Sequence, residues 1–476
     1  MKSDLPKVLH PVAGRPMLGY VVDAALSLNP ERLVVVVGFQ AEKVRAYLAE
    51  AFPDRAFVYA VQQPQLGTGH ALAEARDAVG WEEADLLVLC GDIPLIRPAT
   101  LSSLLDGHLA AGASATVLTA FPDDPSGYGR IIRDPVTKEI VRIVEQADAS
   151  PAEQAVPEVN TGVYCFKVPE IYPLLARLSP ANAQKELYLV DLVALLLGRG
   201  ERVATVTAQR AAEVEGVNDR VQLARAEAER RAEVLTALMR SGVTVTDPAS
   251  TYVDWGVEVG RDSLLEPGTV LRGKTRVGGG CVIGPWSQLV DAVVGDGCRV
   301  WSSVVEGSRL ADGASVGPFS RIRPGTRVGP GARIGNFAEL KNSDIGAGAK
   351  IQHHSYIGDA DVGAEANIGA GTVVVNYDGI AKHRTVIGRG AFIGCNSNLV
   401  APVKVGDGAY TGAGTTVTQE VPPGSLAVGR PRQVNIEGWV HRRRPGTVSA
   451  EAARLAAAGP GGKYGGKLPD GEGGKG

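Results

Sequence analysis

In the second half of the chain, an aliphatic residue recurs at every sixth position over residues 259–405, with a few shorter steps after which the spacing resumes. The first members of this series are Val259, Leu265, Leu271, Val277 and Ile283. Helices repeat apolar residues every three or four positions and amphipathic strands every two, so neither element explains a step of six. The pattern predicts a hexapeptide solenoid, in which each hexapeptide is one short strand and turn of a triangular coil. We therefore expect a left-handed parallel β-helix with the aliphatic side chains inside.

The six-residue step is interrupted between Val374 and Ile387, which are thirteen residues apart. The segment between them contains VNYDGIAKHRT, and its polar composition predicts a loop that leaves the coil. A surface insertion without function would give the same pattern. Polar loops on a rigid scaffold are, however, where binding groups usually lie, so this loop is a candidate for part of a functional site.

The first half of the chain has a different pattern, in which short apolar runs alternate with helical stretches, for example RLVVVVGF, AEKVRAYLAEAF, FVYAVQQ and ADLLVLCGD. This alternation is typical of a Rossmann-like α/β domain with a mostly parallel sheet. The segment RVQLARAEAERRAEVLTALMR, residues 220–240, contains no Gly or Pro and predicts one connecting helix. The expected organisation is an α/β domain at 1–219, a linker helix at 220–241, the β-helix at 242–438 and a disordered tail at 439–476, whose Gly-rich end cannot bury a core.

Composition and charge argue against several classes of function. Lys and Arg number 49 and Asp and Glu 52, a formal net charge of −3 that gives no electrostatic reason to expect nucleic acid or a membrane surface as partner. The longest strongly apolar run, residues 33–37, is far shorter than the roughly 20 residues of a membrane-spanning helix, and no secretory signal pattern is present, so we expect a cytoplasmic protein. The five cysteines are scattered without a CxxC pair, which predicts neither a disulfide framework nor a zinc site.

The β-helical half contains motifs of a known family. QHHSYIGDADVGAEANIGAGTVVVNYDG, together with RIRPG, NFAELKNS and LAVGRP, resembles the acetyltransferase region of the bifunctional N-acetylglucosamine-1-phosphate uridylyltransferase and glucosamine-1-phosphate N-acetyltransferase family. The resemblance implies that acetyl-CoA is the acetyl donor and that His353 is the general base. It also implies a sugar-phosphate site formed by Arg323, Lys341, Tyr356 and Asn367. The implied acetyl-CoA contacts, of which Asn376 and Tyr377 lie beside the reacting centre, are Ala370, Asn376, Tyr377, Cys395, Ala413 and Arg430.

The chemistry of these residue types agrees with the implied roles. An amine attacks a thioester only in its neutral form, so a histidine that titrates near neutral pH can take the proton, while cations neutralise the phosphate. His354 is the obvious rival of His353, but the family spacing of three residues before Tyr356 selects His353. Taken alone, Arg323 and Lys341 could equally be solvated charges on a coil face. Members of the family often have serine at the position of Cys395, and a thiol is a weaker hydrogen-bond partner than a hydroxyl.

Seven short motifs in the first half occur in the order found in the nucleotidyltransferase domain of the same family: KVLHPVAGRPML, QLGTGHA, LCGDIPLI, YGRII, IVEQ, VNTGVYCF and EGVND. The resemblance implies UTP as the uridylyl donor, with Lys7 contacting phosphate, Gln62, Gly67 and Thr68 around the uracil, and Gly129, Glu145 and Asn160 around the sugar. Asp92 and Asn218 would hold Mg²⁺, with Asn218 also facing the nucleotide. One carboxylate and one amide oxygen suit this cation, which keeps several waters and bridges substrate phosphates.

One departure from the family concerns the start of the chain. The family opens with an apolar strand and a glycine-rich loop of the form LAAGxGTRM, and this sequence begins at the final Met of that motif. The loop offers backbone N–H groups and an arginine to the triphosphate, and its strand lies inside the sheet, so we expect the chain as given to bind UTP poorly. We hypothesise that Met1 is a misassigned start.

The sequence thus predicts a bifunctional enzyme of cell-envelope precursor synthesis that acetylates glucosamine-1-phosphate and then couples the product to UTP, yielding UDP-N-acetylglucosamine. The resemblance also implies a homotrimer, in which the coenzyme channel is assembled between subunits. Two alternatives stay open: an enzyme of the acetyl step alone, and a non-catalytic scaffold. A scaffold would not need His353, Tyr356, the NYDG loop and Arg430 together, and their joint presence argues against it.

Overall fold

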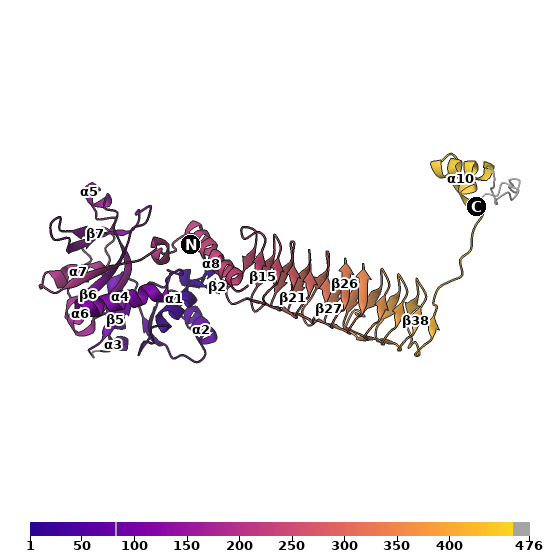
Figure 1. The fold of residues 1–476 in the computed structure, drawn as a ribbon, viewed down its shortest axis with the longest axis horizontal. Coiled ribbons are helices and arrows are strands. Elements are labelled where there is room, and N and C mark those ends of the chain that lie inside the picture. The colour runs from indigo at the N-terminus through magenta and orange to yellow at the C-terminus, as the bar shows by residue number, and fades with distance from the viewer. Residues whose placement is uncertain (81–82, 460–476) are drawn as a thin grey trace.

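A computed structural model describes residues 1–80 and 83–459. An α/β domain lies at one end of an elongated molecule, a long β-helix forms the rest of its length, and a single helix connects the two (Figure 1). A pair of short helices follows the β-helix at the carboxyl end. Within the described residues, no helix is both long and apolar enough to cross a membrane.

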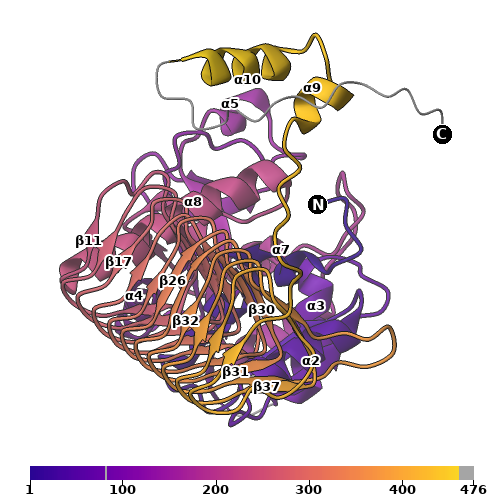
Figure 2. The same cartoon turned by 90° about the vertical axis from the view of Figure 1, so that its right-hand side faces the viewer.

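The β-helix is a triangular prism built from strands of two to four residues that pair only in parallel with the coils before and after them (Figure 2). Face 1, an 11-stranded sheet, contains β11 (Thr244–Val245), β14 (Leu264–Leu265), β17 (Val282–Ile283), β20 (Arg299–Val300), β23 (Ser315–Val316), β26 (Arg333–Asn336), β29 (Lys350–His353), β32 (Asn367–Ile368), β35 (Phe392–Ile393), β38 (Tyr410–Thr411) and β40 (Leu426–Ala427). Face 2, with 10 strands, contains β12 (Tyr252–Val253), β15 (Val270–Arg272), β18 (Gln288–Val290), β21 (Val304–Glu306), β24 (Arg321–Ile322), β27 (Glu339–Lys341), β30 (Tyr356–Gly358), β33 (Val373–Val375), β36 (Asn398–Val400) and β39 (Thr416–Val417). Face 3, with 9 strands, contains β13 (Glu258–Val259), β16 (Arg276–Val277), β19 (Val293–Val294), β22 (Arg309–Leu310), β25 (Arg327–Val328), β28 (Asp344–Ile345), β31 (Ala360–Val362), β34 (Thr385–Ile387) and β37 (Val403–Val405).

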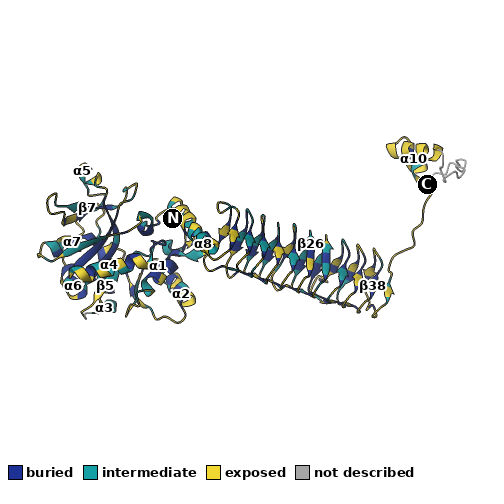
Figure 3. Ribbon diagram, viewed as in Figure 1, coloured by how far each residue is buried: buried dark blue, intermediate teal, exposed yellow. Residues whose placement is uncertain are grey.

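The aliphatic series of the sequence forms the interior of this prism (Figure 3). Leu265, Leu271 and Ile283 are fully buried, and burying each such side chain stabilises the fold by roughly 1.5–3 kcal/mol. Two positions before each aliphatic residue lies a small residue whose side chain often bonds to a carbonyl one coil further on. Cys281 donates to the Gly295 carbonyl at 3.1 Å, as serines and threonines do elsewhere in the column. The hexapeptide prediction is confirmed, and this cysteine acts there as a serine analogue.

In its described residues, the α/β domain contains several helices and three sheets, of which β1 and β2 form the smallest. Its elements are η1 (Lys7–Leu9), β1 (Pro11–Val12), β2 (Arg15–Pro16), α1 (Met17–Leu26), β3 (Val34–Val37), α2 (Ala41–Ala51), β4 (Val58–Val61), α3 (Thr68–Val79), β5 (Asp85–Val88), α4 (Pro98–Ala111), β6 (Ala115–Ala120), β7 (Gly129–Arg133), β8 (Ile140–Val144), α5 (Pro151–Gln154), β9 (Val159–Lys167), α6 (Val168–Leu175), α7 (Val190–Leu197), β10 (Val203–Thr207) and η2 (Ala211–Val214). The main sheet has the order β10-β6-β9-β7-β8, with β5 also paired to β9, and β3 and β4 form a separate two-stranded sheet.

The strand directions differ in part from the sequence prediction. β3–β4 and β6–β10 are parallel, as expected, but β9 runs antiparallel to β5, β6 and β7, and β7–β8 is an antiparallel hairpin. The hairpin follows from the short turn between β7 and β8, because parallel neighbours need a long crossover connection. In the described residues no strand joins β3 to β5, so the sheet is divided into two parts.

The connecting helix α8 (Arg220–Arg240) matches the predicted range and is capped by Asp219, which accepts from the amides of Val221 and Gln222 at 2.8 Å. Its Arg230 is buried between the rings of Tyr20 in the α/β domain, 4.4 Å away, and Trp255 in the first coil, 5.5 Å away.

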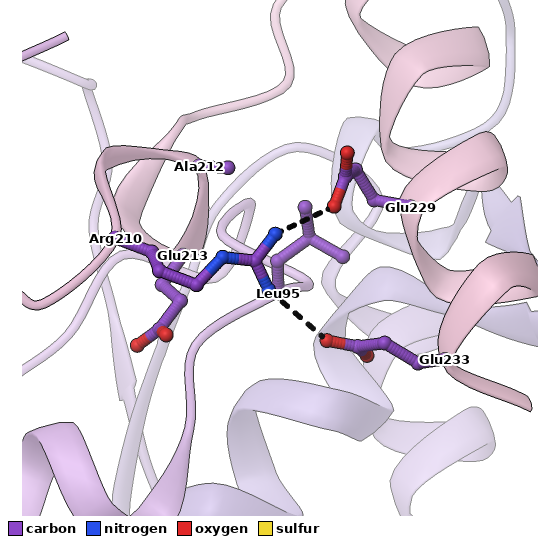
Figure 4. A pocket seen from close by; sticks show the side chains of 6 residues that line it. All are labelled: Leu95, Arg210, Ala212, Glu213, Glu229 and Glu233. Carbon is purple, nitrogen blue, oxygen red and sulfur yellow. Dashed lines mark hydrogen bonds and ion pairs between the residues drawn. The ribbon is translucent and has the colours of Figure 1, made fainter. Parts of the chain in front are cut away.

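Next to Arg230 on α8, a shallow depression beside η2 is crossed by ion pairs (Figure 4). Arg210 pairs with Glu229 at 2.8 Å and with Glu233 at 3.9 Å, and Glu233 also pairs with Arg97 at 2.8 Å. Cations therefore neutralise the carboxylates at this position, and the helix is held to the α/β domain by ion pairs and by the cation–π contact of Arg230 with Tyr20.

The carboxyl-terminal segment corrects the predicted disordered tail. Residues 439–458 include α9 (Trp439–Arg443) and α10 (Val448–Ala458), and the rest of the predicted tail, 460–476, lies outside the described residues. The alanine-rich stretch has high helix propensity, and the Thr447 side chain caps α10 by accepting from the Ala450 amide at 3.3 Å. The Gly-rich composition that motivated the prediction belongs to the end of the segment only.

Candidate active sites

One edge of the prism, where each coil turns from face 1 to face 2, carries the predicted base and four of the six predicted acetyl-CoA residues; we call it the 1–2 edge. The turns stack through backbone bonds: the Asn396 amide donates to the Ala370 carbonyl at 2.7 Å, and the Gly414 amide donates to the Cys395 carbonyl at 2.8 Å. The Arg430 guanidinium donates to the Ala413 carbonyl at 2.6 Å. The column that the structure brings together runs through Asn336, His353, Ala370, Cys395, Ala413 and Arg430.

His353 ends strand β29 and is paired in register with Asn336 on the preceding coil. Its Nδ1 lies 3.1 Å from Asn336 Oδ1. An amide oxygen can only accept, so this bond assigns the imidazole proton to Nδ1 and leaves Nε2 as a proton acceptor. His354 lies in the turn after β29, with a φ of 40°, and its backbone amide joins two coils by donating to the Asn336 carbonyl at 3.0 Å. Sequence reasoning missed Asn336, although it lies in the motif NFAELKNS.

The opposite edge of face 2, where each coil turns to face 3, carries the predicted phosphate ligands; we call it the 2–3 edge. Lys341 ends β27, and Arg323 follows β24 one coil earlier and pairs with Glu339 at 2.8 Å. Tyr356 lies on face 2 between the two edges. Asn367, by contrast, belongs to face 1, so one chain does not bring it together with Arg323 and Lys341.

A glycine is required next to Tyr356. Gly358 is paired in register with Lys341, and a Cβ there would collide with the Tyr356 hydroxyl and lie 2.8 Å from Asn376 Nδ2. Asn376 Nδ2 is itself 3.5 Å from the Tyr356 hydroxyl. The missing side chain thus lets the tyrosine and the asparagine converge at the end of face 2.

The predicted loop leaves the prism at the 2–3 edge between β33 and β34 (Figure 2). It closes on itself through a bridge between Tyr377 and Lys382 and a bond from the His383 amide to the Asn376 carbonyl at 2.8 Å. Asp378 accepts from the amides of Ile380 and Ala381 at 2.8 and 2.7 Å, and these bonds, with His383, hold its pKa below the usual range.

Lys382 of the loop adds a second ammonium group near Lys341, at the 2–3 edge that carries the predicted phosphate ligands. The proximity of this second ammonium group, together with desolvation, lowers the pKa of Lys341. Asp359 and Lys382 were not selected from the sequence, because nothing in its spacing indicates that the loop folds back toward Lys341.

In the α/β domain, Lys7 lies between the two predicted magnesium ligands. Its Nζ is 2.5 Å from Asp92 Oδ2 and donates to Asn218 Oδ1 at 2.9 Å. Both oxygens therefore face one cation, and carboxylate and amide oxygens are donors that would suit Mg²⁺. In residues 1–80 and 83–459, no three His, Cys, Asp or Glu side chains gather as a metal site. A metal ion here would take its remaining ligands from water and substrate phosphate.

The predicted uracil residues lie together at the start of α3. Gln62 Nε2 donates to the Gly67 carbonyl at 2.8 Å, and Gly67 has a φ of 108°, which favours glycine. Thr68 is the first residue of α3, and its hydroxyl accepts from the Leu189 amide at 3.1 Å. His70 lies 3.1 Å from the same Gln62 amide and was not selected from the sequence.

The three predicted sugar residues also converge. Gly129 and Asn160 are paired in register on β7 and β9, and the Glu145 carboxylate lies against Gly129. Asn160 is held by a bond from its Nδ2 to the Tyr164 hydroxyl at 2.7 Å. Desolvation, with smaller contributions from Asp148 and Asp191, raises the pKa of Glu145, as expected for a buried carboxyl group that lies near other carboxylates.

An α/β nucleotidyltransferase-like domain followed by a hexapeptide β-helix defines a two-domain transferase. Residues 1–189 match the MobA-like NTP transferase domain, and residues 384–419 match the bacterial transferase hexapeptide family. The chain is 48% identical to the bifunctional protein GlmU of Geobacillus sp. over 93% of this chain and 95% of that protein. It is 49% identical to GlmU of Thermobifida fusca, with 96% and 95% covered, and 48% identical to GlmU of Nocardia farcinica, with 96% and 93% covered.

The chain therefore belongs to the GlmU family of bifunctional proteins, and both its acetyltransferase and its uridylyltransferase domain are present. Among solved structures, it is similar to a UDP-glucose pyrophosphorylase complexed with UDP-glucose, at a TM-score of 0.41 and 18% identity, with 48% of this chain and 91% of that chain covered.

Proposed function

We propose that the residues described above carry out the two steps of UDP-N-acetylglucosamine synthesis, with acetyl transfer to glucosamine-1-phosphate on the β-helix and uridylyl transfer from UTP in the α/β domain. The observation that carries the acetyl assignment is the His353–Asn336 contact of 3.1 Å, which frees Nε2 to accept a proton. The assignment also includes a cytoplasmic location, where these substrates are made.

In the acetyl step, His353 Nε2 takes a proton from the sugar amine as its nitrogen bonds to the acetyl carbon. The carbon–sulfur bond of the thioester breaks, and the leaving sulfur takes up the proton that protonated His353 gives back, so that CoA leaves as the thiol. Arg323 and Lys341 neutralise the sugar phosphate, and Tyr356 and Asn376 orient the ring between the two edges. Arg430, at the end of the 1–2 edge, pairs with a phosphate of the coenzyme. Ala370, Cys395 and Ala413 contact the coenzyme along this edge. Tyr377 of the loop lies beside the reacting centre.

In the uridylyl step, Gln62, Gly67 and Thr68 hold the uracil, and Gly129, Glu145 and Asn160 hold the sugar. Lys7 neutralises the α-phosphate while a sugar-phosphate oxygen attacks it in line and pyrophosphate leaves. Asp92 and Asn218 are the residues that would hold Mg²⁺, which supplies charge neutralisation at the reacting phosphates when bound.

We further propose that the protein acts as a homotrimer. His353 and Lys341 lie at opposite edges of face 2, and Asn367 lies on face 1, so the 1–2 edge of a second copy is needed to enclose a substrate at the 2–3 edge. The 1–2 edge also exposes aromatic rings, among them stacked Phe319 and Phe337, which are 62% and 57% exposed. Apolar patches of this kind are typical of protein–protein contacts. Sedimentation should give three chains of 49.6 kDa.

The test of the proposed function is release of CoA thiol from acetyl-CoA and glucosamine-1-phosphate. We expect His353→Ala to be at least about a hundredfold slower than the wild type, because a general base contributes that much, and His354→Ala to stay within about twofold. Equal losses in both variants would contradict the assignment of the base. Pyrophosphate release, followed on the same samples, should be unaffected by either change.

One observation favours a narrower activity for the 476-residue chain. Within the described residues, the sheet of the α/β domain is divided between β3 and β5. Acetyl transfer alone is therefore the second candidate function. It predicts CoA release without measurable pyrophosphate release.

A further inference from the structure

Asp359 is a buried carboxylate to which the proposed mechanism gives no role. It lies in the turn between β30 and β31 at the 2–3 edge, is 8% exposed and has a φ of 50°. A carboxylate at such a position is destabilising unless it is paired or fully hydrogen-bonded. The groups that face it therefore indicate what it does.

The two ends of loop 376–384 meet at this residue. At the start of the loop, Asn376 Nδ2 donates to Asp359 Oδ2 at 2.6 Å. At its end, the Thr385 amide donates to the Asp359 carbonyl at 3.1 Å. The Asp359 amide in turn donates to the Lys341 carbonyl at 2.9 Å, and Asn342 Nδ2 donates to the second carboxylate oxygen at 2.6 Å. One residue thus joins both ends of the loop to the coil that carries Lys341.

The Asp359 carboxylate also faces Lys341 and Lys382, the two lysines at the 2–3 edge. Desolvation opposes its ionisation, but the bonds from Asn342 and Asn376 and the charges of Lys341 and Lys382 outweigh this and lower the pKa of Asp359. It is therefore ionised at neutral pH. Its charge reduces the repulsion between the two ammonium groups, which otherwise favours the movement of Lys382 away from Lys341.

We propose that Asp359 is a positioning residue for acetyl transfer, which fixes both ends of loop 376–384 and so keeps Lys382 beside Lys341 at the sugar-phosphate end of the site. The inference rests on the proposed function and adds Asp359 and Lys382 to the residues that determine how the sugar phosphate binds. A purely electrostatic role has the opposite consequence, because a carboxylate beside cations weakens their attraction for a phosphate.

The variant Asp359→Asn separates the two roles. A carboxylate accepts from Asn342 and Asn376 on different oxygens, whereas an amide has one oxygen and turns its NH₂ toward the other donor. With one end of the loop released, the KM for glucosamine-1-phosphate should rise about tenfold although the site has gained positive charge, and the KM for acetyl-CoA should stay within about twofold. A lower or unchanged KM for the sugar phosphate would overturn the positioning role.

The matched control is Asp361→Asn, two residues along the chain. Asp361 is 43% exposed at its side chain and pairs with Arg384, which keeps a second partner, Asp344, at 3.2 Å. Arg384 belongs to the same loop, so this control tests whether the loss of any exposed loop contact is enough. Because Arg384 stays paired with Asp344 and exposed pairs contribute little, both KM values should change less than about twofold.

Hydrogen exchange of the full chain gives a readout that does not depend on turnover. Amides of 376–385 should exchange faster in Asp359→Asn than in the wild type, while amides of the coils before Asn342 stay unchanged; unchanged exchange in the loop would also overturn the proposal. A wild-type chain that releases no CoA contradicts the proposed function. An active wild type, with an Asp359→Asn variant of unchanged KM, contradicts only the role of Asp359.

Discussion

The two halves of the molecule position their candidate sites by different means. On the β-helix, each predicted residue occupies a fixed place on a coil, and its neighbours are the residues one coil before and after, as with His353 and Asn336. In the α/β domain, the candidate site depends on contacts between segments far apart in the chain, as with Lys7 and Asn218. The comparison teaches that a repeat fold specifies a site through local stacking, whereas the α/β site depends on the assembly of the whole sheet.

The same comparison applies to stability. Ile351 is fully buried in the prism, whereas Val36 in the two-stranded sheet is 37% exposed. We expect Ile351→Ala to reduce the free energy of unfolding of the β-helix by about 2–5 kcal/mol, because it leaves a cavity in a closely packed core. Val36→Ala should cost the α/β domain less than about 0.5 kcal/mol. Urea unfolding of the two variants, followed by tryptophan fluorescence and by circular dichroism, measures both, and equal costs would contradict the comparison.

A second change sharpens the comparison at the level of the site. In Gly358→Ala, the added Cβ collides with the Tyr356 hydroxyl and displaces Asn376 at the sugar-phosphate end. The KM for glucosamine-1-phosphate should rise at least about tenfold, since losing one charged or well-oriented hydrogen bond has an effect of this size. Steady-state CoA release measures the effect. Gly390→Ala is a control at a turn with open space around it. Its φ of 62° adds backbone strain without a collision at the sugar-phosphate end, so it should have the smaller effect on KM.

The smallest expected effect concerns Glu145 in the α/β domain. Desolvation raises its pKa in the folded state, so the folded domain binds this proton more tightly than the unfolded chain. The contribution of Glu145 to stability is then greatest below the unfolded pKa and is lost as the pH rises through the folded pKa. Glu145→Gln should therefore raise the melting temperature at pH 7 and leave it nearly unchanged at pH 4, while it impairs uridylyl transfer. A lower melting temperature at pH 7 would contradict this.

The sequence predicted the β-helix well because its determinants are local. The aliphatic series, the thirteen-residue step and the range of α8 all follow from spacing and composition, and the structure places them as expected. The mixed strand directions of the α/β domain and the helices after Trp439 did not follow, since β9 pairs with strands far away in sequence and a Gly-rich end dominated the composition of the tail.

Candidate site residues could be predicted where they lie in a recognisable motif. They could not be predicted where a loop returns to the β-helix and creates a contact that the sequence does not indicate. Lys7, Asp92 and Asn218 each lie in a motif, and they contact one another in the structure. Asn336, Asp359 and Lys382 were not predicted from the sequence. Their roles depend on which residues of neighbouring coils lie next to each other and on how the loop returns to the 2–3 edge.

The most direct test of this account compares the two activities in one sample of the 476-residue chain, with CoA release and pyrophosphate release measured at saturating substrates. The β-helical site is built from stacked coils, and the nucleotide site lies in a divided sheet, so CoA release should be faster than pyrophosphate release by at least about tenfold, a difference of about 1.4 kcal/mol in activation free energy. Equal rates, or pyrophosphate release without CoA release, would contradict the account.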